Sequence, residues 1–337
     1  MAAFAEGTPC WVDVSLPDLE AGKRFYGELF GWTFGRAAGA ERGHYTEAFS
    51  DGKRVAGLVA KRDGRMPTVW GVYFATSDAV ALSRRIREAG GQLVREPVAV
   101  GRSGVMAQAA DPAGAVFGLW QAGDEAGFEK KGLPGSFCWT EVYTRDKARV
   151  DPFYESVFGF RGVDVPGADV PSADASGPDV PGGGDSGVDF RMWFPADAAP
   201  GEAGAAPGAA GAVGGRSVIT DAFPAELPGH FLSYFSVADC DRTSGTAVRL
   251  GGRITAPPFG IASGRMAVLV DNQGASFAVL EERTAEGTEE TEAAEAPNAP
   301  NAPEAPLTES APESVSEPES GPEPESGRKR RLGWKRT

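Results

Sequence analysis

A long internal repeat limits the folds that this chain can adopt. Residues 10–32 open with Cys-Trp-Val-Asp-Val and close with Phe-Tyr-Gly-Glu-Leu-Phe-Gly-Trp. Residues 138–160 open with Cys-Trp-Thr-Glu-Val and close with Phe-Tyr-Glu-Ser-Val-Phe-Gly-Phe, and the two copies align without a gap. Similarity at one fixed separation over such a length indicates a duplicated domain.

The later part of each copy repeats as well, at a larger separation. Residues 70–74 (Trp-Gly-Val-Tyr-Phe) match residues 231–235 (Phe-Leu-Ser-Tyr-Phe). The separation grows from 128 to 161 positions, so the second copy carries an insertion of that difference. Stretches rich in Pro, Gly, Ala and Asp lie within residues 165–216, and we expect a flexible insertion there.

The length of 337 residues is sufficient for two domains. The repeat predicts a first domain over 7–122, a linker over 123–134 and a second domain over 135–283. Residues 284–337 are rich in Ala, Pro and Glu and end in a basic segment. We expect this tail to be disordered, because it has too few apolar side chains to offset the entropy of ordering.

Charge and composition exclude some classes of partner. The formal net charge is −14, which argues against nucleic acid, since phosphate binding requires a concentrated basic surface. The three cysteines do not form a disulfide framework, and we find no signal peptide and no stretch long enough to span a membrane. We therefore expect a cytoplasmic protein that contacts neither nucleic acid nor a membrane.

The local patterns predict the same order of elements in each half of a domain. Residues 11–16 alternate as a strand, Asp18 precedes a helix over 21–30, and Gly31 ends that helix. Asp78 opens a second helix, and a turn at 111–114 joins the last two strands. The further strands are expected at 44–49, 55–61, 69–75, 93–96, 105–109 and 115–120. Strand, helix and three strands, repeated, predict an α+β fold with helices on one face of a mixed sheet.

These features resemble the vicinal oxygen chelate superfamily, which includes glyoxalase I, bleomycin-resistance proteins and extradiol dioxygenases. The resemblance rests on the Asp-capped helix with Phe-Tyr-x-x-x-Phe-Gly-Trp/Phe and on the late Asp-Pro-x-Gly hairpin, and it covers 8–283. It implies two tandem domains, each of two βαβββ modules curled into a cup that holds a ligand. For the metal enzymes of this superfamily, the resemblance implies a cup that holds a divalent ion, which polarises substrate oxygens.

The positions of the family's metal ligands carry no donor side chain here. The resemblance places the ligand positions at the residues Trp11, Gly57, Gly71 and Gly118 in the first copy, and Trp139, Val218, Leu232 and Ala278 in the second. A catalytic site needs about three nitrogen or oxygen ligands. We therefore expect no metal and no cofactor, with His230 as the one residual metal-ligand candidate if the alignment slips by two residues.

Two acids are the main candidates for chemistry in the cups. Asp13 lies two residues after Trp11, and Glu141 lies two residues after Trp139, so each acid shares a strand face with an indole. Such an acid could be a general base with a raised pKa or an acceptor for a polar or cationic ligand. It could equally bond backbone N–H groups or an arginine and only hold the strand.

The other candidates carry weaker signals. Met106 and Met266 occupy matched strand positions, where they either line the cups or fill the core. We expect Tyr73 and Tyr234 to pack under the helices. His44 precedes a predicted strand, and we expect it to be exposed.

Three functions remain open from the sequence. The first is a binding protein of the bleomycin-resistance type that takes up an aromatic or cationic small molecule in cups lined by Trp11, Asp13, Trp139, Glu141, Met106 and Met266. The second is a glyoxalase-like lyase, isomerase or hydroxylase that uses Asp13 or Glu141 as the acid–base group, or a non-standard metal site. The third is a scaffold whose acidic tail recruits a partner. The two domains either face each other as an intramolecular pseudo-dimer or pair with another chain.

Overall fold

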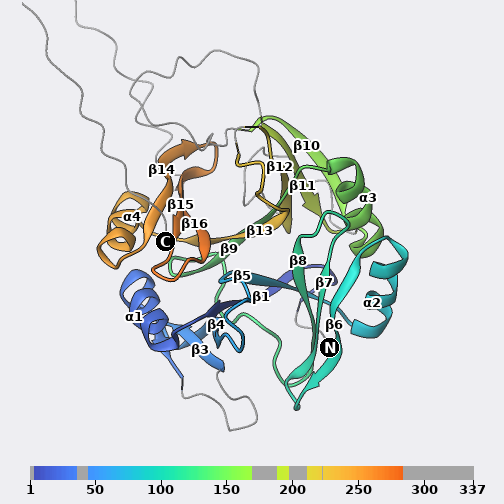
Figure 1. Cartoon of the computed structure of the whole chain (residues 1–337), viewed down its shortest axis with the longest axis horizontal. Helices are drawn as coiled ribbons and strands as arrows, with labels where there is room; N and C mark the ends of the chain where they lie inside the picture. Colours follow the sequence, from blue (N-terminus) through green and yellow to red (C-terminus); the bar gives the residue numbers. More distant parts are fainter. Residues whose placement is uncertain (1–3, 36–44, 169–187, 197–210, 222, 284–337) are drawn as a thin grey trace, which may run out of the picture. The chain divides into compact units, whose positions relative to one another are not determined.

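The computed structural model describes residues 4–35, 45–168, 188–196, 211–221 and 223–283. Within these residues each half of the chain forms one eight-stranded mixed sheet (Figure 1). The first sheet has the strand order β2-β3-β4-β1-β5-β8-β7-β6, and the second has the matching order β10-β11-β12-β9-β13-β16-β15-β14. The tail at 284–337 and His44 lie outside the described residues.

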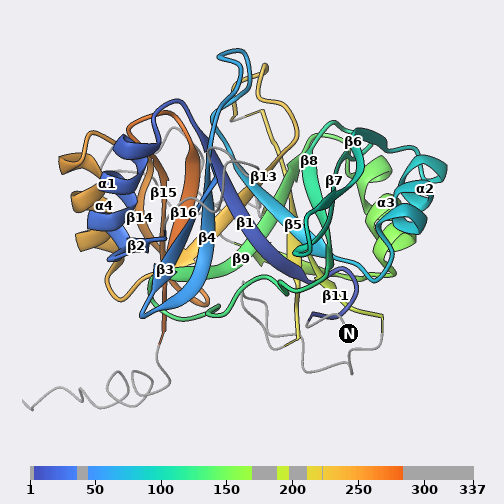
Figure 2. The same cartoon turned by 90° about the horizontal axis from the view of Figure 1, so that it is seen from below.

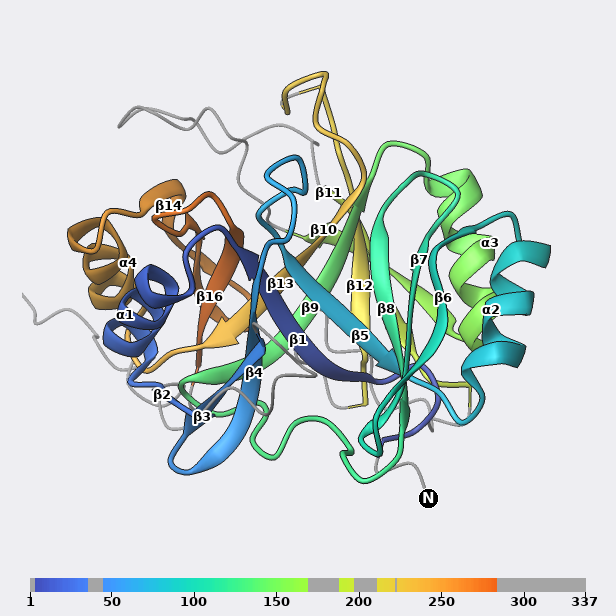
Figure 3. The same cartoon turned by 60° about the horizontal axis from the view of Figure 1, so that its bottom comes forward.

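The first half of the chain contains two βαβββ modules in succession. Its elements are β1 (Pro9–Leu16), α1 (Leu19–Phe30), β2 (Thr33–Phe34), β3 (Tyr45–Ser50), β4 (Lys53–Ala60), β5 (Trp70–Ala75), α2 (Ala79–Glu88), β6 (Gln92–Val100), β7 (Gly104–Ala110) and β8 (Val116–Ala122). The strands β1 and β5 pair antiparallel at the centre of the sheet (Figure 3). On their outer sides, β4 pairs parallel with β1, and β8 pairs parallel with β5.

The second half repeats this order. Its elements are β9 (Ser136–Thr144), α3 (Lys147–Phe158), β10 (Arg161–Ala168), β11 (Val188–Phe194), β12 (Gly214–Val218), β13 (His230–Ser236), α4 (Cys240–Arg249), β14 (Arg253–Ile261), β15 (Gly264–Val270) and β16 (Ser276–Glu282). The predicted α+β fold with four βαβββ modules is therefore confirmed.

The helix ends follow from the repeated sequence. The carboxylate of Asp18 accepts the backbone N–H of Ala21 at the start of α1, and Gly31 ends the helix at φ 72°. In the second copy Asp146 accepts the backbone N–H of Arg149, and Gly159 ends α3 at φ 71°. Only glycine adopts this left-handed conformation without strain, which explains the glycine at both ends.

The helix-bearing faces of the two sheets pack against each other. Figures 1 and 2 show α1 beside α4 and α2 beside α3. Between these helix pairs, Trp70 of the first sheet lies 4.8 Å from Phe235 of the second, measured between ring centroids. Phe74 of the first sheet likewise lies 5.1 Å from Phe158. One apolar core thus serves both halves of the chain, and the opposite face of each sheet is left to form a cup.

Two buried hydrogen bonds join the halves reciprocally. The Tyr26 hydroxyl of α1 donates to Asp271 at 2.8 Å, and the Tyr154 hydroxyl of α3 donates to Asp111 at 3.1 Å. Each aspartate also accepts two backbone N–H groups of its own hairpin turn, for example those of Ala113 and Ala115 at Asp111. The hairpin aspartates of the repeat therefore fix both the turn and the junction.

The structure describes strands within the range 165–216, where the sequence predicts a flexible insertion. The end of β10, all of β11 and the start of β12 fall inside this range, while residues 169–187 and 197–210 lie outside the described part of the chain. The strand β11 forms because its apolar residues alternate. Phe190, Met192 and Phe194 pack in the second cup, and Trp193 between them packs in the shared core.

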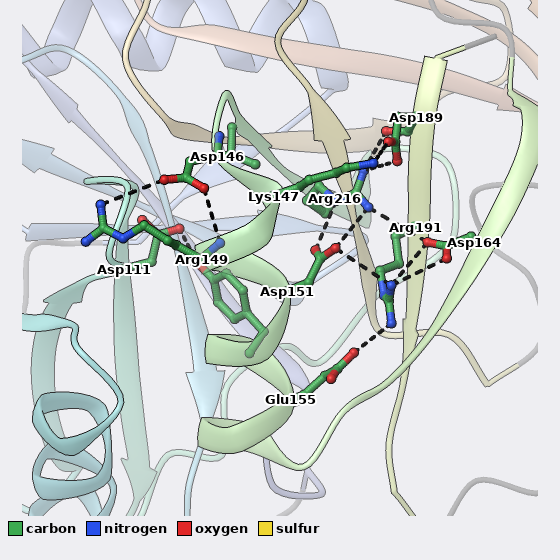
Figure 4. A network of polar contacts seen from close by, with 12 residues as sticks. Asp111, Asp146, Lys147, Arg149, Asp151, Glu155, Asp164, Asp189, Arg191 and Arg216 are labelled. Atoms are coloured by element: carbon green, nitrogen blue, oxygen red, sulfur yellow. Dashed lines mark hydrogen bonds and ion pairs between the residues drawn. The ribbon is translucent and has the colours of Figure 1, made fainter.

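A network of charged residues holds these strands to α3 (Figure 4). The guanidinium of Arg216 is 1% exposed and donates to both carboxylate oxygens of Asp151, at 3.0 and 3.1 Å, and to Asp189 at 2.6 Å. Arg191 pairs with Glu155 of the same helix and with Asp164 of β10. The buried Arg216 is therefore fully compensated by carboxylates.

Across the residues that the structure describes, no helix is both long and apolar enough to cross a membrane.

Candidate functional site

A cavity of about 780 Å³ opens on the outer face of the first sheet. Strands β1, β3, β4, β5, β6, β7 and β8 contribute to its lining, together with the segments that follow β4, β6 and β8. The polar part of the lining includes Asp13, Ser15, Tyr45, Glu47, Arg54, Lys61, Arg62, Tyr73, Arg95, Gln108 and Glu125. The apolar part includes Trp11, Val59, Met66, Val94, Val98, Met106 and Trp120. Its size is that of a small-molecule site.

Asp13 lies on the central strand of this cavity. Its Oδ2 accepts a hydrogen bond of 3.0 Å from the Tyr73 hydroxyl, and no other hydrogen bond to its side chain is found among the described residues. Burial raises the pKa of Asp13 from 3.8 to about 7, and the Tyr73 bond offsets part of that rise. The carboxyl group therefore changes its charge near neutral pH.

Tyr45 supplies a second polar group beside Asp13. The indole N–H of Trp11 donates to the Tyr45 hydroxyl oxygen at 2.6 Å. Because this oxygen already accepts a hydrogen bond from Trp11, its own O–H is directed away from Trp11, and no acceptor for it is found among the described residues. Burial and the nearby Asp13 charge raise the pKa of Tyr45, so the phenol keeps its proton. Asp13 and Tyr45 together present an acceptor and a donor.

Three glycines make room for these side chains. A Cβ on Gly57 would lie 2.1 Å from the Tyr45 hydroxyl oxygen, and a Cβ on Gly118 would lie 2.1 Å from the Tyr73 ring. Gly71 faces the carboxylate of Asp13, which would be 3.3 Å from an added Cβ. These are three of the positions that the resemblance assigns to metal ligands, and the space beside them is filled by the acid and the two tyrosines.

The residues at the expected ligand positions of this cup therefore do not supply the donors that the resemblance implies. Trp11, Gly57, Gly71 and Gly118 offer no side-chain donor to a cation. In the part of the chain that the structure describes, no group of three or more His, Cys, Asp or Glu side chains is placed to hold a metal ion. Asp13 and Tyr45 are left as the polar groups at the base of the cup.

The corresponding face of the second sheet is packed with side chains. Trp139, Leu232, Tyr234 and Met266 are at most 4% exposed and belong to one apolar cluster with Phe190 and Met192. Glu141 is 3% exposed within it. Its carboxylate accepts bonds of 3.0 Å from the Trp139 indole and from the Ser217 hydroxyl, while burial raises its pKa.

The structure thus separates the predicted site residues into two groups. Trp11, Asp13 and Met106 line the cavity of the first sheet. Trp139, Glu141 and Met266 are buried in the second. His230 begins β13, where its ring stacks on Tyr143 with 5.3 Å between centroids and its Nδ1 lies 2.9 Å from the Pro228 carbonyl oxygen.

Two expectations from the sequence are corrected. Tyr73 does not pack under a helix but lines the cavity, because residues 71 and 73 are two apart and share a strand face. Tyr234 likewise belongs to the apolar cluster of the second cup. The register also pairs Gly57 with Asp13 and Gly215 with Glu141, so the equivalent of Gly57 is Gly215 and not Val218.

Several lining residues were missed by the sequence analysis. Alternation from Gly71 gives Tyr73, and alternation along β3 gives Tyr45 and Glu47 on one face, so these had a usable signal. Arg95 had no such sequence signal, because β6 has two register irregularities, one between Leu93 and Arg95 and one between Arg95 and Val98. Such irregularities break the two-residue alternation on which the prediction depends.

Comparisons with known proteins agree with this fold. A model of the Glyoxalase/Bleomycin resistance protein/Dioxygenase superfamily matches residues 11–119. The anthracycline biosynthesis protein DauV of Streptomyces sp. (strain C5) is 35% identical over 299 residues, which cover 85% of this chain and 97% of that protein. The anthracycline biosynthesis protein DnrV of Streptomyces peucetius is 35% identical over 300 residues, covering 84% and 96%.

Among solved structures, the Mn(II)-bound glyoxalase from Novosphingobium aromaticivorans shares the fold, with a TM-score of 0.52 and 17% identity over 83% of this chain and 84% of that chain. The fold, the order of the modules and the identity to the Streptomyces proteins lead to one assignment. The chain belongs to the Glyoxalase/Bleomycin resistance protein/Dioxygenase superfamily.

Proposed function

We propose that the cup of the first sheet binds a small polycyclic aromatic molecule, without a metal ion, and that the second sheet has a structural role. The observation that carries the proposal is the open cavity, with Asp13 and Tyr45 at its base, opposite a second cup that is packed with side chains. Trp11, Trp120 and Met106 supply apolar and aromatic surface for a flat ligand. The identity to two anthracycline biosynthesis proteins supports a ligand of fused aromatic rings.

We also propose how the two domains associate and where in the cell the protein acts. The domains over 7–122 and 135–283 act as an intramolecular pseudo-dimer in the cytoplasm, without nucleic acid. The reciprocal Tyr26–Asp271 and Tyr154–Asp111 bonds and the net charge of −14 support this view.

Calorimetric titration with 2-(hydroxymethyl)anthraquinone, a neutral compound, tests the binding proposal. We expect one compound per chain in buffer that contains a chelator. Asp13→Ala removes an acceptor and should weaken binding about tenfold. Met266→Leu, which alters the packed second cup at nearly constant volume, should leave the affinity unchanged. Equal affinities for wild type and Asp13→Ala would contradict the assignment of the site.

A second candidate function is acid–base catalysis by Asp13. The pKa of about 7 and the Tyr45 O–H beside it favour this chemistry over a role for Glu141, which is 3% exposed. The carboxylate would take a proton from a carbon acid while Tyr45 donates to the oxygen that gains charge. The probe 5-nitrobenzisoxazole reports such a step, since removal of its C–H proton breaks its N–O bond. We expect a rate that rises with pH through 7 and is lost in Asp13→Asn.

A further inference from the structure

The cavity lining carries four basic side chains and three acidic ones, and they differ in whether they are paired. Arg54 lies 3.8 Å from Glu47, 3.6 Å from Glu125 and 3.0 Å from Glu129, so its charge is compensated by acids. Three further cations, Lys61, Arg62 and Arg95, line the cavity. None of the three has a carboxylate partner among the described residues, and the Lys61 ammonium donates to the Thr68 hydroxyl at 3.0 Å.

Arg95 is the cation that β6 contributes to the cavity lining. It lies on β6 and is exposed, while its neighbour Glu96 is held by Arg87 of α2. The positive charge of Arg95 opposes the rise in the pKa of Tyr73, the tyrosine that donates to Asp13. An ionic substituent on a ligand in the cup would therefore experience this charge.

Apolar side chains lie between these cations on the cavity lining. Met66, Val94 and Val98 are 48%, 58% and 42% exposed. Exposed apolar groups beside uncompensated cations suit a ligand that is flat and apolar but carries a negative group. The lining therefore favours an anion, whereas the sequence had suggested an aromatic or cationic ligand.

We propose that Arg95, with Lys61 and Arg62, forms a subsite for an anionic substituent, a carboxylate or sulfonate, on the aromatic ligand of the first cup. This inference rests on the proposed function, because it requires the ring system to occupy the cavity. Tyr45 and Asp13 bind a hydroxyl or carbonyl group at the inner end of the ligand, and the cations bind the acid at the outer end. The ligand class is then an aromatic acid.

The charge of Asp13 gives this subsite a characteristic pH dependence. The titratable groups that face Asp13 are Tyr45 of β3 and Tyr73 of β5. The other charged groups of the lining are Glu47 of β3, Arg54 of β4, Lys61 and Arg62 after β4, Arg95 of β6 and Glu125 after β8. Below pH 7 Asp13 is neutral, and above pH 7 it repels an anion in the same cavity. The affinity for an acid should fall as the pH rises, and the affinity for an amine should rise.

Three matched compounds test the subsite by calorimetric titration of the full chain. They are anthraquinone-2-carboxylate, the neutral 2-(hydroxymethyl)anthraquinone and the cationic 2-(aminomethyl)anthraquinone. At pH 6 and low salt we expect the carboxylate to bind about fivefold more tightly than the neutral compound. Arg95→Gln should abolish this advantage. Arg84→Gln, which changes an exposed arginine of α2 outside the cavity, should preserve it.

The possible outcomes separate the two proposals. If the neutral compound binds and the carboxylate binds no more tightly, or if the amine binds best, the anion subsite is overturned while the binding proposal stands. If none of the three compounds binds, the proposed function and the inference built on it both fail. An advantage of the carboxylate that disappears in Arg95→Gln and declines from pH 6 to pH 8 supports the subsite.

Discussion

The two cups have the same topology but differ in the size of a few side chains. The register places Gly71 and Leu232 at the same position, opposite Asp13 and Glu141 respectively. Beside the equivalent glycines 57 and 215, the first cup has Glu47 and the second has Met192. Opposite residues 118 and 278, the first has Gln108 and the second has Val268. Each change replaces a small or polar residue by an apolar side chain.

This difference shows how a duplicated fold can keep one cup open while the other is packed with apolar side chains. The second sheet uses its cup as a further apolar core, while the first sheet keeps polar side chains facing an open cavity. The acid is retained in both, but its surroundings differ. Glu141 receives bonds from Trp139 and Ser217, whereas Asp13 receives one from Tyr73. The chemistry available to an acid is thus set by the packing around it.

The largest effect on stability is expected at Arg216. In the first sheet Leu58 pairs with Val14, and in the second sheet Arg216 pairs with the matching Val142. Leu58 and Arg216 therefore occupy equivalent positions. Arg216→Met removes a buried cation that compensates Asp151 and Asp189, so we expect a loss of about 3–5 kcal/mol in the free energy of unfolding. Leu58→Met should cost less than about 1.5 kcal/mol. Urea unfolding measures the loss in the free energy of unfolding for both variants, and equal losses would contradict this prediction.

The next effect concerns the packing of the second cup. Leu232 is 4% exposed inside the apolar cluster, so Leu232→Ala should leave a cavity and cost about 2–4 kcal/mol. At the matching position of the first cup, Gly71→Ala should change stability by less than about 1 kcal/mol, since an added Cβ would lie 3.3 Å from the Asp13 carboxylate and make its other contacts at 3.8 Å or more. A similar cost at both positions would show that the two cups are equally packed.

A pH-dependent effect is expected at Asp13. Its pKa in the folded protein is about 7 against 3.8 for the ordinary value, so the folded state binds more protons between these limits. The contribution of Asp13 to the stability should therefore fall as the pH rises from 4 to 7. Asp13→Asn lacks this penalty, and we expect it to be more stable than the wild type at pH 8 and equally stable below pH 4. A pH-independent difference in thermal unfolding would disprove the raised pKa.

The smallest effects are expected at the junction of the halves. Tyr154→Phe removes the hydrogen bond to Asp111, so it should cost about 1 kcal/mol. Tyr26→Phe removes the bond to Asp271 and also the bond of 3.0 Å that the Tyr26 hydroxyl accepts from the Trp70 indole, so it should cost about 2 kcal/mol. The loss for Tyr26→Phe in denaturant unfolding should therefore exceed the loss for Tyr154→Phe by about 1 kcal/mol, because the Trp70 N–H is left without its acceptor. Equal losses would show that the Trp70 bond adds nothing to the junction.

The sequence predicted the repeated elements well because their signals are local. Asp18 and Gly31 mark the ends of α1 within one short segment, and their counterparts Asp146 and Gly159 do the same for α3. The strand β11 was missed because it lies between two stretches of low apolar content. Which cup is open could not be predicted from the sequence. It depends on the residues that Gly71 and Leu232 face on the neighbouring strands, and these follow only from the register of the sheets.

We propose that the first cup is the ligand site and that the second is not. Gly71→Leu places the leucine of the second cup at the matching position of the first, so it should fill part of the first cavity. Titration calorimetry with anthraquinone-2-carboxylate should give one site per chain in the wild type and at least a hundredfold weaker binding in Gly71→Leu, with the thermal unfolding midpoint retained. Two sites per chain, or unchanged affinity in the folded variant, would contradict the account.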